Sequence, residues 1–156
     1  MPVKTQGTDL YVIDPLDDSL IDVGCVTSID GIDTTPSSID ISCLNSQARE
    51  FMAGMENPGT MTFGLSTDPS NANHLRLLEL KQAGETLKWA VGWSESPGTE
   101  PTIDSAGAFV ADALRSWLFF EGFINAFPFS FAIDAVVASN VAVQVSGAIT
   151  LVPVGS

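Results

Sequence analysis

The chain has 156 residues, of which 45% are hydrophobic and 16% are charged. This composition is typical of a folded protein of one domain, and at this length folding buries roughly 70% of the surface of the extended chain. Lys and Arg number 6 against 19 Asp and Glu, so the formal net charge is -13. Because proteins bind nucleic acids through Lys and Arg side chains that neutralise phosphates, this charge argues against sequence-specific DNA binding.

The acidic residues are concentrated in the first part of the chain. Lys4 is the only base in the first 45 residues, and no charged side chain follows Asp134. This asymmetry predicts one solvated, acidic end and one end that is packed or paired. The two cysteines, Cys25 and Cys43, lie in or beside apolar runs, where we expect small buried thiols and neither a disulfide framework nor a zinc site.

The first half of the chain predicts strands separated by turns. Strands are expected at residues 10–14, 20–33, 39–44 and 59–66, with turns at residues 15–19 and 34–38. In the fourth of these strands Met61, Phe63 and Leu65 fall on one face, because side chains alternate along a strand.

One amphipathic helix is predicted over residues 70–84. Asp68 and Pro69 offer an N-cap acid and a proline at the first helical position, and Gly84 is the expected stop. Arg76 and Glu79 are spaced as an i,i+3 ion pair. His74 is the only histidine and has no nucleophile motif, so we interpret it as a residue on the helix surface or rim and not as a catalytic base.

The second half of the chain predicts more strands. Residues 86–93 place Trp89, Val91 and Trp93 on one face, which is typical of a core. A loop is expected from residue 94 to about residue 112, followed by the aromatic-rich segment 114–134. The terminal segment 136–154 alternates like a strand, with a turn expected at Ser139 and Asn140.

This order of elements predicts a mainly β protein. We expect an antiparallel β-sandwich or partly closed barrel with one inserted α-helix, as a single domain spanning residues 1–156. No signal peptide is visible, and the uncharged terminal stretch is interrupted by polar residues, so it indicates strands and not a membrane span.

The sequence contains no recognisable catalytic motif. It has no GxSxG elbow, no phosphate-binding loop and no HExxH pair. The acidic run at residues 14–22 weakly resembles a calcium loop, but it lacks the glycine and glutamate at the positions that an EF-hand requires. We therefore expect a protein that is not an enzyme and that has no cofactor or metal site.

The features between residues 5 and 131 resemble, as a set, the tail tube protein of long, non-contractile-tailed bacteriophages. The resemblance is carried by "REFMAG", "PGTMTFGLSTD", the helix "NHLRLLELKQAG" and the strand "ETLKWAVGW", in that order. It implies a structural virion protein whose subunits form hexameric rings that stack around a DNA channel. Some members carry a carboxy-terminal immunoglobulin-like domain, and none follows here before Ser156.

The resemblance also implies partners and a location. The main partner would be the chain itself, with tail tip and tail terminator proteins at the ends of the tube. The tape measure protein and phage DNA would pass through the lumen without sequence-specific binding. The protein would be assembled in the host cytoplasm, become part of the virion tail and have no membrane partner.

The family implies that the loop before "GTMTF" reaches the neighbouring ring. The residues assigned to this docking loop are Arg49, Glu50, Phe51, Met52 and Met55. Met and Phe are adaptable interface residues, and we expect Gly54 and the break at residues 57–59 to let the loop change course. The alternative is that these side chains fold back onto the core of their own subunit.

The acid excess fits a channel that must not bind its cargo, because a wall poor in Lys and Arg does not hold phosphates. The candidate lumen or rim acids are Asp14, Asp17, Asp18 and Asp22. A plain solubilising surface is the alternative for each of them.

Two other functions remain open from the residues. One is a small-molecule-binding β-barrel, in which Trp89 and Trp93 would line a cavity. The other is a different phage morphogenesis protein, such as a tail terminator or a head-decoration protein, which would form one closed ring or a trimer and no filament.

Overall fold

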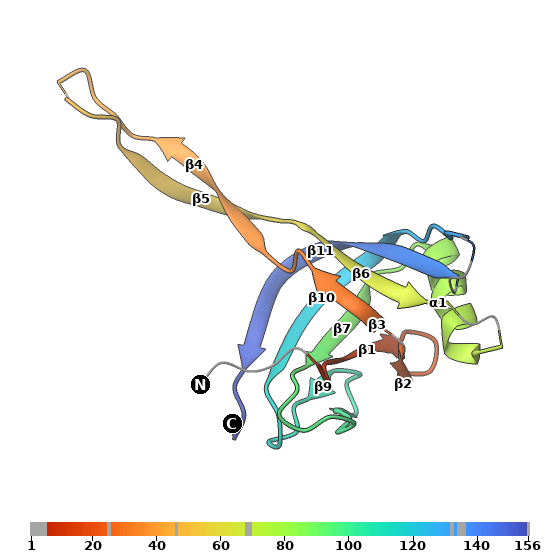
Figure 1. Ribbon diagram of the computed structural model, residues 1–156. Helices are drawn as coiled ribbons and strands as arrows, with labels where there is room; N and C mark the ends of the chain where they lie inside the picture. The colour runs from red at the N-terminus through yellow and green to blue at the C-terminus, as the bar shows by residue number, and fades with distance from the viewer. Residues whose placement is uncertain are drawn as a thin grey trace.

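The computed structural model describes residues 6–24, 26–45, 47–67, 70–131, 133 and 137–155, without the side chains at positions 34, 56, 58 and 148. Its main element is a seven-stranded antiparallel sheet with the strand order β2-β1-β7-β10-β11-β6-β3 (Figure 1). The strands are β1 (Asp9–Asp14), β2 (Ser19–Asp22), β3 (Val26–Asp30), β6 (Thr60–Ser66), β7 (Leu87–Gly92), β10 (Trp117–Ala126) and β11 (Ala138–Val152). The expected mainly β, antiparallel fold with one helix is therefore confirmed.

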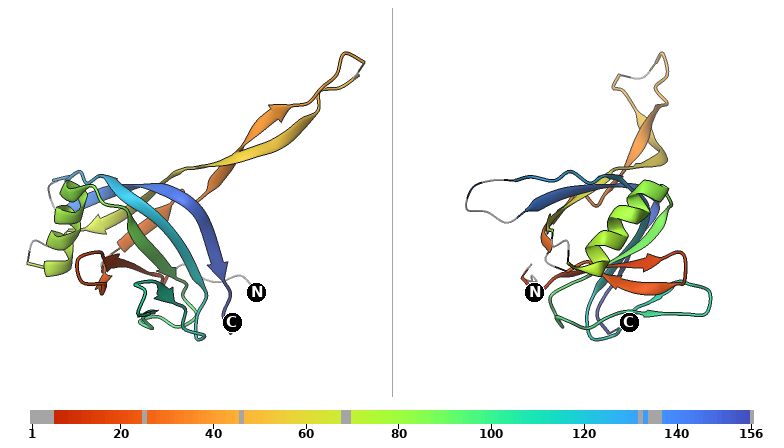
Figure 2. Two further views of the ribbon diagram at one scale, coloured as in Figure 1. Left: turned by 180° about the vertical axis from the view of Figure 1, so that it is seen from behind. Right: turned by 90° about the vertical axis from the view of Figure 1, so that its right-hand side faces the viewer.

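The sheet is strongly curved, and the helix α1 (Ala72–Ala83) covers one end of its concave face (Figure 2). The core lies on that face because the apolar side chains of each strand alternate toward it. Trp89 is fully buried between Phe63 and Phe120, with ring centroids 5.9 and 6.3 Å away, and its indole Nε1 donates to the Gly122 carbonyl at 3.1 Å. Trp93 is only half-buried against the same core.

The helix begins later than the sequence predicted. Its N-cap is Asn71, whose side chain accepts a hydrogen bond from the Asn73 backbone N–H, so the proposed Asp68 cap is wrong. Asp68 and Pro69 themselves lie outside the described residues. The stop at Gly84 is confirmed, since this residue adopts the left-handed conformation that glycine tolerates best.

His74 corrects a second expectation about the helix. It is 2% exposed, and its Nε2 lies 2.8 Å from the Val23 carbonyl oxygen, so it is a core residue that joins the helix to the sheet and not a surface residue. The buried face of the helix consists of His74, Leu77 and Leu80. The apolar pattern did not predict that His74 is buried, because histidine is not counted among the apolar residues.

Three further expectations are wrong. Ser139 and Asn140 form no turn but pair with Leu65 and Gly64 within β11, where Ser139 is buried with its Oγ 2.7 Å from the Thr67 hydroxyl. The expected loop from residue 94 contains two short paired strands, β8 (Thr102–Ile103) and β9 (Phe109–Val110). Cys43 is exposed and not buried, and Cys25 lies outside the described residues.

Arg115 fastens the amino-terminal segment to the loop that carries β8 and β9. Its guanidinium is fully buried, forms an ion pair with Asp9 at 3.0 Å and donates to the carbonyls of Gly7 and Gly92. The same group lies 5.2 Å from the ring of Trp117. The Asp9 carboxylate and the carbonyl acceptors offset the cost of burying this charge. Among the described residues, no helix is long and apolar enough to cross a membrane.

Candidate assembly interface

A long β-hairpin projects from the body of the molecule (Figures 1 and 2). It consists of β4 (Thr34–Asp40) and β5 (Phe51–Pro58), which pair only with each other. The sequence predicted a turn at residues 34–38 and a break in the chain at residues 57–59, and both of these expectations about local structure are wrong. The docking role of the segment stays a prediction. Residues 57 and 58 pair with residues 35 and 34, and only Gly59 separates β5 from β6.

One backbone–backbone and one side-chain hydrogen bond extend the hairpin beyond its strands. The Ile41 N–H donates to the Glu50 carbonyl at 3.0 Å, and the Glu50 N–H donates to the Ser42 hydroxyl at 2.7 Å. In the middle of the hairpin, a Cβ at Gly54 would lie 2.5 Å from the Ser37 Oγ. Gly54 therefore lets β4 and β5 approach closely where the register shifts, and it does not serve as the hinge that the sequence suggested.

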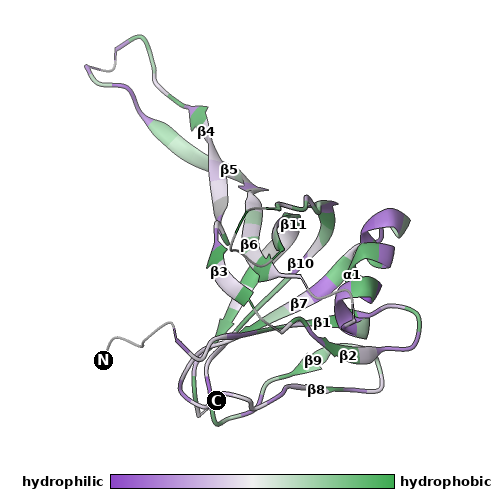
Figure 3. Cartoon of the chain, turned by 45° about the vertical axis from the view of Figure 1, so that its right-hand side comes forward, coloured by the Kyte–Doolittle hydropathy of each residue, from purple (hydrophilic) through white to green (hydrophobic). Residues whose placement is uncertain are grey.

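The apolar side chains assigned to docking are exposed on this hairpin. The exposed fractions are 56% for Phe51, 50% for Met52 and 85% for Met55, so these residues do not fold back onto the core of their own subunit. Figure 3 shows the hydrophobic stretches of the hairpin far from the rest of the molecule. An exposed apolar surface of this kind is typical of a protein–protein contact.

The structure adds residues to this surface. Ile39, Ile41 and Leu44 are also exposed, and the register places Ile39 directly opposite Met52. The alternation at residues 39–41 was visible in the sequence, but it was assigned to a strand of the main sheet because a hairpin without a core cannot be recognised from alternation alone. Arg49 and Glu50 are exposed near the tip, and neither forms an ion pair within the described part of the chain.

The four candidate lumen acids lie together on the β1–β2 hairpin, and Asp14 differs from the others. It is buried and accepts hydrogen bonds from the Arg76 guanidinium at 2.7 and 2.9 Å. These bonds hold the pKa of Asp14 below its usual value, and Arg76 also forms the predicted ion pair with Glu79 at 2.9 Å. Asp14 is therefore not a plain solubilising residue.

The remaining three acids are exposed: Asp17, Asp18 and Asp22. Desolvation raises the pKa of Asp22. The assignment of these side chains to a lumen or rim stays a prediction.

A second face of the molecule is open and polar. On the convex side of β3, β6 and β11, cross-strand pairs bring together Asp30 with Thr62, Thr60 with Gln144, and Asn140 with Gly64. This face continues onto β10 at Phe123, which pairs with Gln144. No Lys or Arg occurs in the sequence of these four strands.

The two tryptophans do not line one cavity. Trp89 is enclosed in the core, whereas Trp93 lines a groove of about 850 Å³ together with Val91, Val26 and Ile29. Within the residues that the structure describes, no cluster of His, Cys, Asp or Glu could hold a metal ion.

The whole chain matches a known family. A family model described as "Phage tail tube, TTP, lambda-like" covers residues 1–154. The chain belongs to this phage tail tube family. A curated relative, "Structural protein 3" of Pseudomonas phage PAJU2, is 50% identical over 154 residues, which are 97% of this chain and 94% of the relative. The tail tube protein is therefore a structural component of the virion tail and not an enzyme.

Solved structures show the same fold. The SPP1 tail tube has a TM-score of 0.71 at 12% identity and covers 97% of this chain and 80% of the other. A tail subunit of an empty GTA particle, from a structure with C6 symmetry, has a TM-score of 0.69 at 11% identity. The match covers 97% of this chain and 99% of the other. The sheath–tube complex of an extracellular contractile injection system (PVC) has a TM-score of 0.68 at 12% identity, and the match covers 98% of this chain and 93% of the other.

Proposed function

We propose that this chain is the major subunit of a phage tail tube, and that its copies close into rings that stack around a DNA-conducting channel. The observation that carries this proposal is the projecting β4–β5 hairpin, which exposes Phe51, Met52 and Met55 at a distance from the body. In an isolated monomer such a hairpin is an aggregation liability, because its apolar side chains are exposed and no third strand of the described residues pairs with it. Contact with the neighbouring ring supplies that partner.

The open face of β3, β6, β11 and β10 is suited to line the channel. Its side chains are mainly small and polar, with Asp30 on the edge strand β3, and the four strands carry no cation. Such a wall does not hold DNA phosphates, and at physiological salt its charge acts over only about 8 Å. On this basis we favour this face, and not the β1–β2 hairpin with Asp14 and Asp22, as the lumen wall.

Rings of six subunits would match the C6 symmetry stated for the GTA tail structure. A heterologous contact between identical subunits closes into a ring when its rotation allows. Tail tip and tail terminator proteins would then bound the tube. The tape measure protein and DNA would occupy the lumen without sequence-specific contacts, and assembly would take place in the host cytoplasm.

The proposal is tested by placing a charge on the hairpin. Phe51→Asp or Met52→Asp should abolish the stacking of rings while leaving the subunit folded, because a carboxylate buried in an apolar contact without a partner is strongly disfavoured. Tube formation is followed by sedimentation, and folding by circular dichroism. Leu75→Asp is the matched control, since Leu75 is 48% exposed on α1 and Met52 is 50% exposed. Variants that still form tubes, or that fail to fold, would contradict the assignment of the hairpin.

A further inference from the structure

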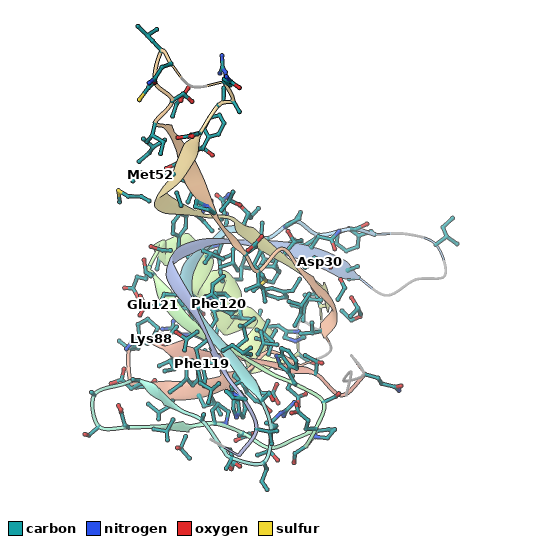
Figure 4. The ribbon with its side chains drawn as sticks, turned by 90° about the vertical axis from the view of Figure 1, so that its left-hand side faces the viewer. Asp30, Met52, Lys88, Phe119, Phe120 and Glu121 are labelled. Atoms are coloured by element: carbon teal, nitrogen blue, oxygen red, sulfur yellow. The ribbon has the colours of Figure 1, made fainter. Side chains whose placement is uncertain are left out.

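A groove of about 380 Å³ lies on the convex face where β7, β10 and β11 meet. Its floor contains the stacked rings of Phe109 and Phe119, whose centroids are 5.6 Å apart. Lys88 and Glu121 stand at its rim on neighbouring strands, and Thr150 borders it on β11. Figure 4 shows Lys88, Phe119 and Glu121 close together on the body, while Met52 projects from the hairpin well away from them.

The groove lies beside an open strand edge. β6 ends its pairing with β11 at Thr60 and Gln144, and beyond Val145 the described part of β11 pairs only with β10. The segment from Ser146 to Val152 therefore has an open edge on one side, which is interrupted by an irregularity at residues 147–149, because Ser146 pairs with Glu121 and Thr150 pairs with Phe119. An exposed edge of this length next to an apolar groove is a template for another strand.

The hairpin carries a surface that is complementary to this groove. Because residues directly opposite in an antiparallel pair share a face, Ile39 and Met52 lie on one face of the hairpin, together with Ile41 and Glu50. This face thus combines three exposed apolar side chains with one carboxylate. The groove combines an apolar floor with the ammonium group of Lys88 and, directly opposite Lys88 in the strand register, the carboxylate of Glu121.

Lys88 is available for such a partner. Its Nζ donates to the Gly107 carbonyl at 3.1 Å, and it forms no ion pair within the described residues. By contrast, Arg76 and Arg115 are held by carboxylates of their own chain. In a chain with a net charge of -13, a cation at the rim of an apolar groove is an uncommon feature that favours an acidic partner.

We propose that this groove receives the β4–β5 hairpin of a second copy of the chain, with Ile39 and Met52 against Phe119 and with Glu50 opposite Lys88. The hairpin cannot fill the groove of its own subunit, because it extends away from the body (Figures 1 and 4). This inference rests on the proposed tube function and names the surface that receives the hairpin. It assigns Lys88 and Glu50 as the residues that set the position of the contact.

A charge exchange tests this assignment. Lys88→Glu and Glu50→Lys, each alone, should raise the protein concentration needed for tube formation by roughly tenfold, and the double variant should restore assembly. Lys81→Glu and Glu85→Lys are matched controls that make the same changes at the helix end and should assemble normally. If both single variants fold and the double variant assembles no better than they do, the pairing is wrong.

A crosslinking measurement keeps the proposal testable if a charge variant misfolds. With Met52 replaced by the photoreactive p-benzoyl-phenylalanine, irradiated tubes should contain crosslinks to peptides that include Lys88, Phe119 or Thr150 of another copy. Tubes whose crosslinks map only to other surfaces would overturn the docking site and leave the tube function intact. A wild-type protein that forms no tubes would overturn both.

Discussion

Trp89 illustrates which residues a sequence can assign to a core. The alternation of residues 86–93 predicted a buried face, and Trp89 is indeed enclosed by Phe63 and Phe120 and hydrogen-bonded to Gly122. The same pattern could not distinguish it from Trp93, which sits at the end of the strand and is only half-buried. Alternation specifies the face of a strand, whereas burial also depends on what covers that face.

Truncation of Trp89 should therefore be costly. We expect Trp89→Ala to lower the free energy of unfolding by roughly 3–5 kcal/mol, because it leaves a large cavity and removes the hydrogen bond to the Gly122 carbonyl. Trp93→Ala, at the half-buried position, should cost clearly less. Urea unfolding followed by circular dichroism measures both, and equal losses for the two variants would contradict this account of the core.

The ion pair between Asp14 and Arg76 should make stability depend on pH. Since Arg76 lowers the pKa of Asp14 in the folded state, the pair contributes stability above the unfolded pKa of about 4 and loses it as the pH falls through the lower folded value. Asp14→Asn should be less stable than the wild type at pH 7, and this difference should shrink below about pH 4. The exposed Asp17→Asn is the control. A difference that stays constant from pH 7 to pH 3 would show that the charge of Asp14 is not involved.

At the scale of single elements, the helix and most strands of the main sheet could be predicted, but the hairpin could not. The leucine spacing and Gly84 predicted where the helix lies. Its actual N-cap, Asn71, was not predicted, because Asp68 and Pro69 match the usual start signal of a helix more closely. Residues 34–40 contain Pro36 and four hydroxyl side chains, a composition that favours a turn locally. They form a strand because β5 pairs with them, and such pairing is a tertiary effect that local propensity does not report.

Gly54 offers a test of the hairpin as a rigid element. Gly54→Val should reduce tube formation, because the new side chain collides with Ser37 and disturbs the pairing of β4 with β5. The free energy of unfolding of the body should change by no more than about 0.5 kcal/mol, since none of the described side chains of the hairpin belongs to the core. Ala53→Val introduces the same residue at an exposed neighbour and should assemble. Normal assembly of the Gly54 variant would show that the hairpin tolerates distortion.

At the scale of the whole molecule, the mainly β class and the family could be predicted from the sequence, whereas the positions of the exposed surfaces could not. The residues assigned to docking (Arg49, Glu50, Phe51, Met52 and Met55) are all exposed, but their placement on a projecting hairpin results from the pairing of β4 with β5, and their docking role stays a prediction. Asp14 was grouped with solvated acids because its partner, Arg76, is distant in the sequence. Two side chains that are distant in the sequence and come together only in the folded protein produce no pattern in the local sequence.

The central claim is that the chain polymerises into a hollow tube. Negative-stain electron microscopy of the purified full chain, concentrated or seeded with a tail-tip initiator, tests this claim most directly. We predict rings and hollow tubes of uniform width, whose length grows with protein concentration. Compact, solitary particles under all of these conditions would contradict the account.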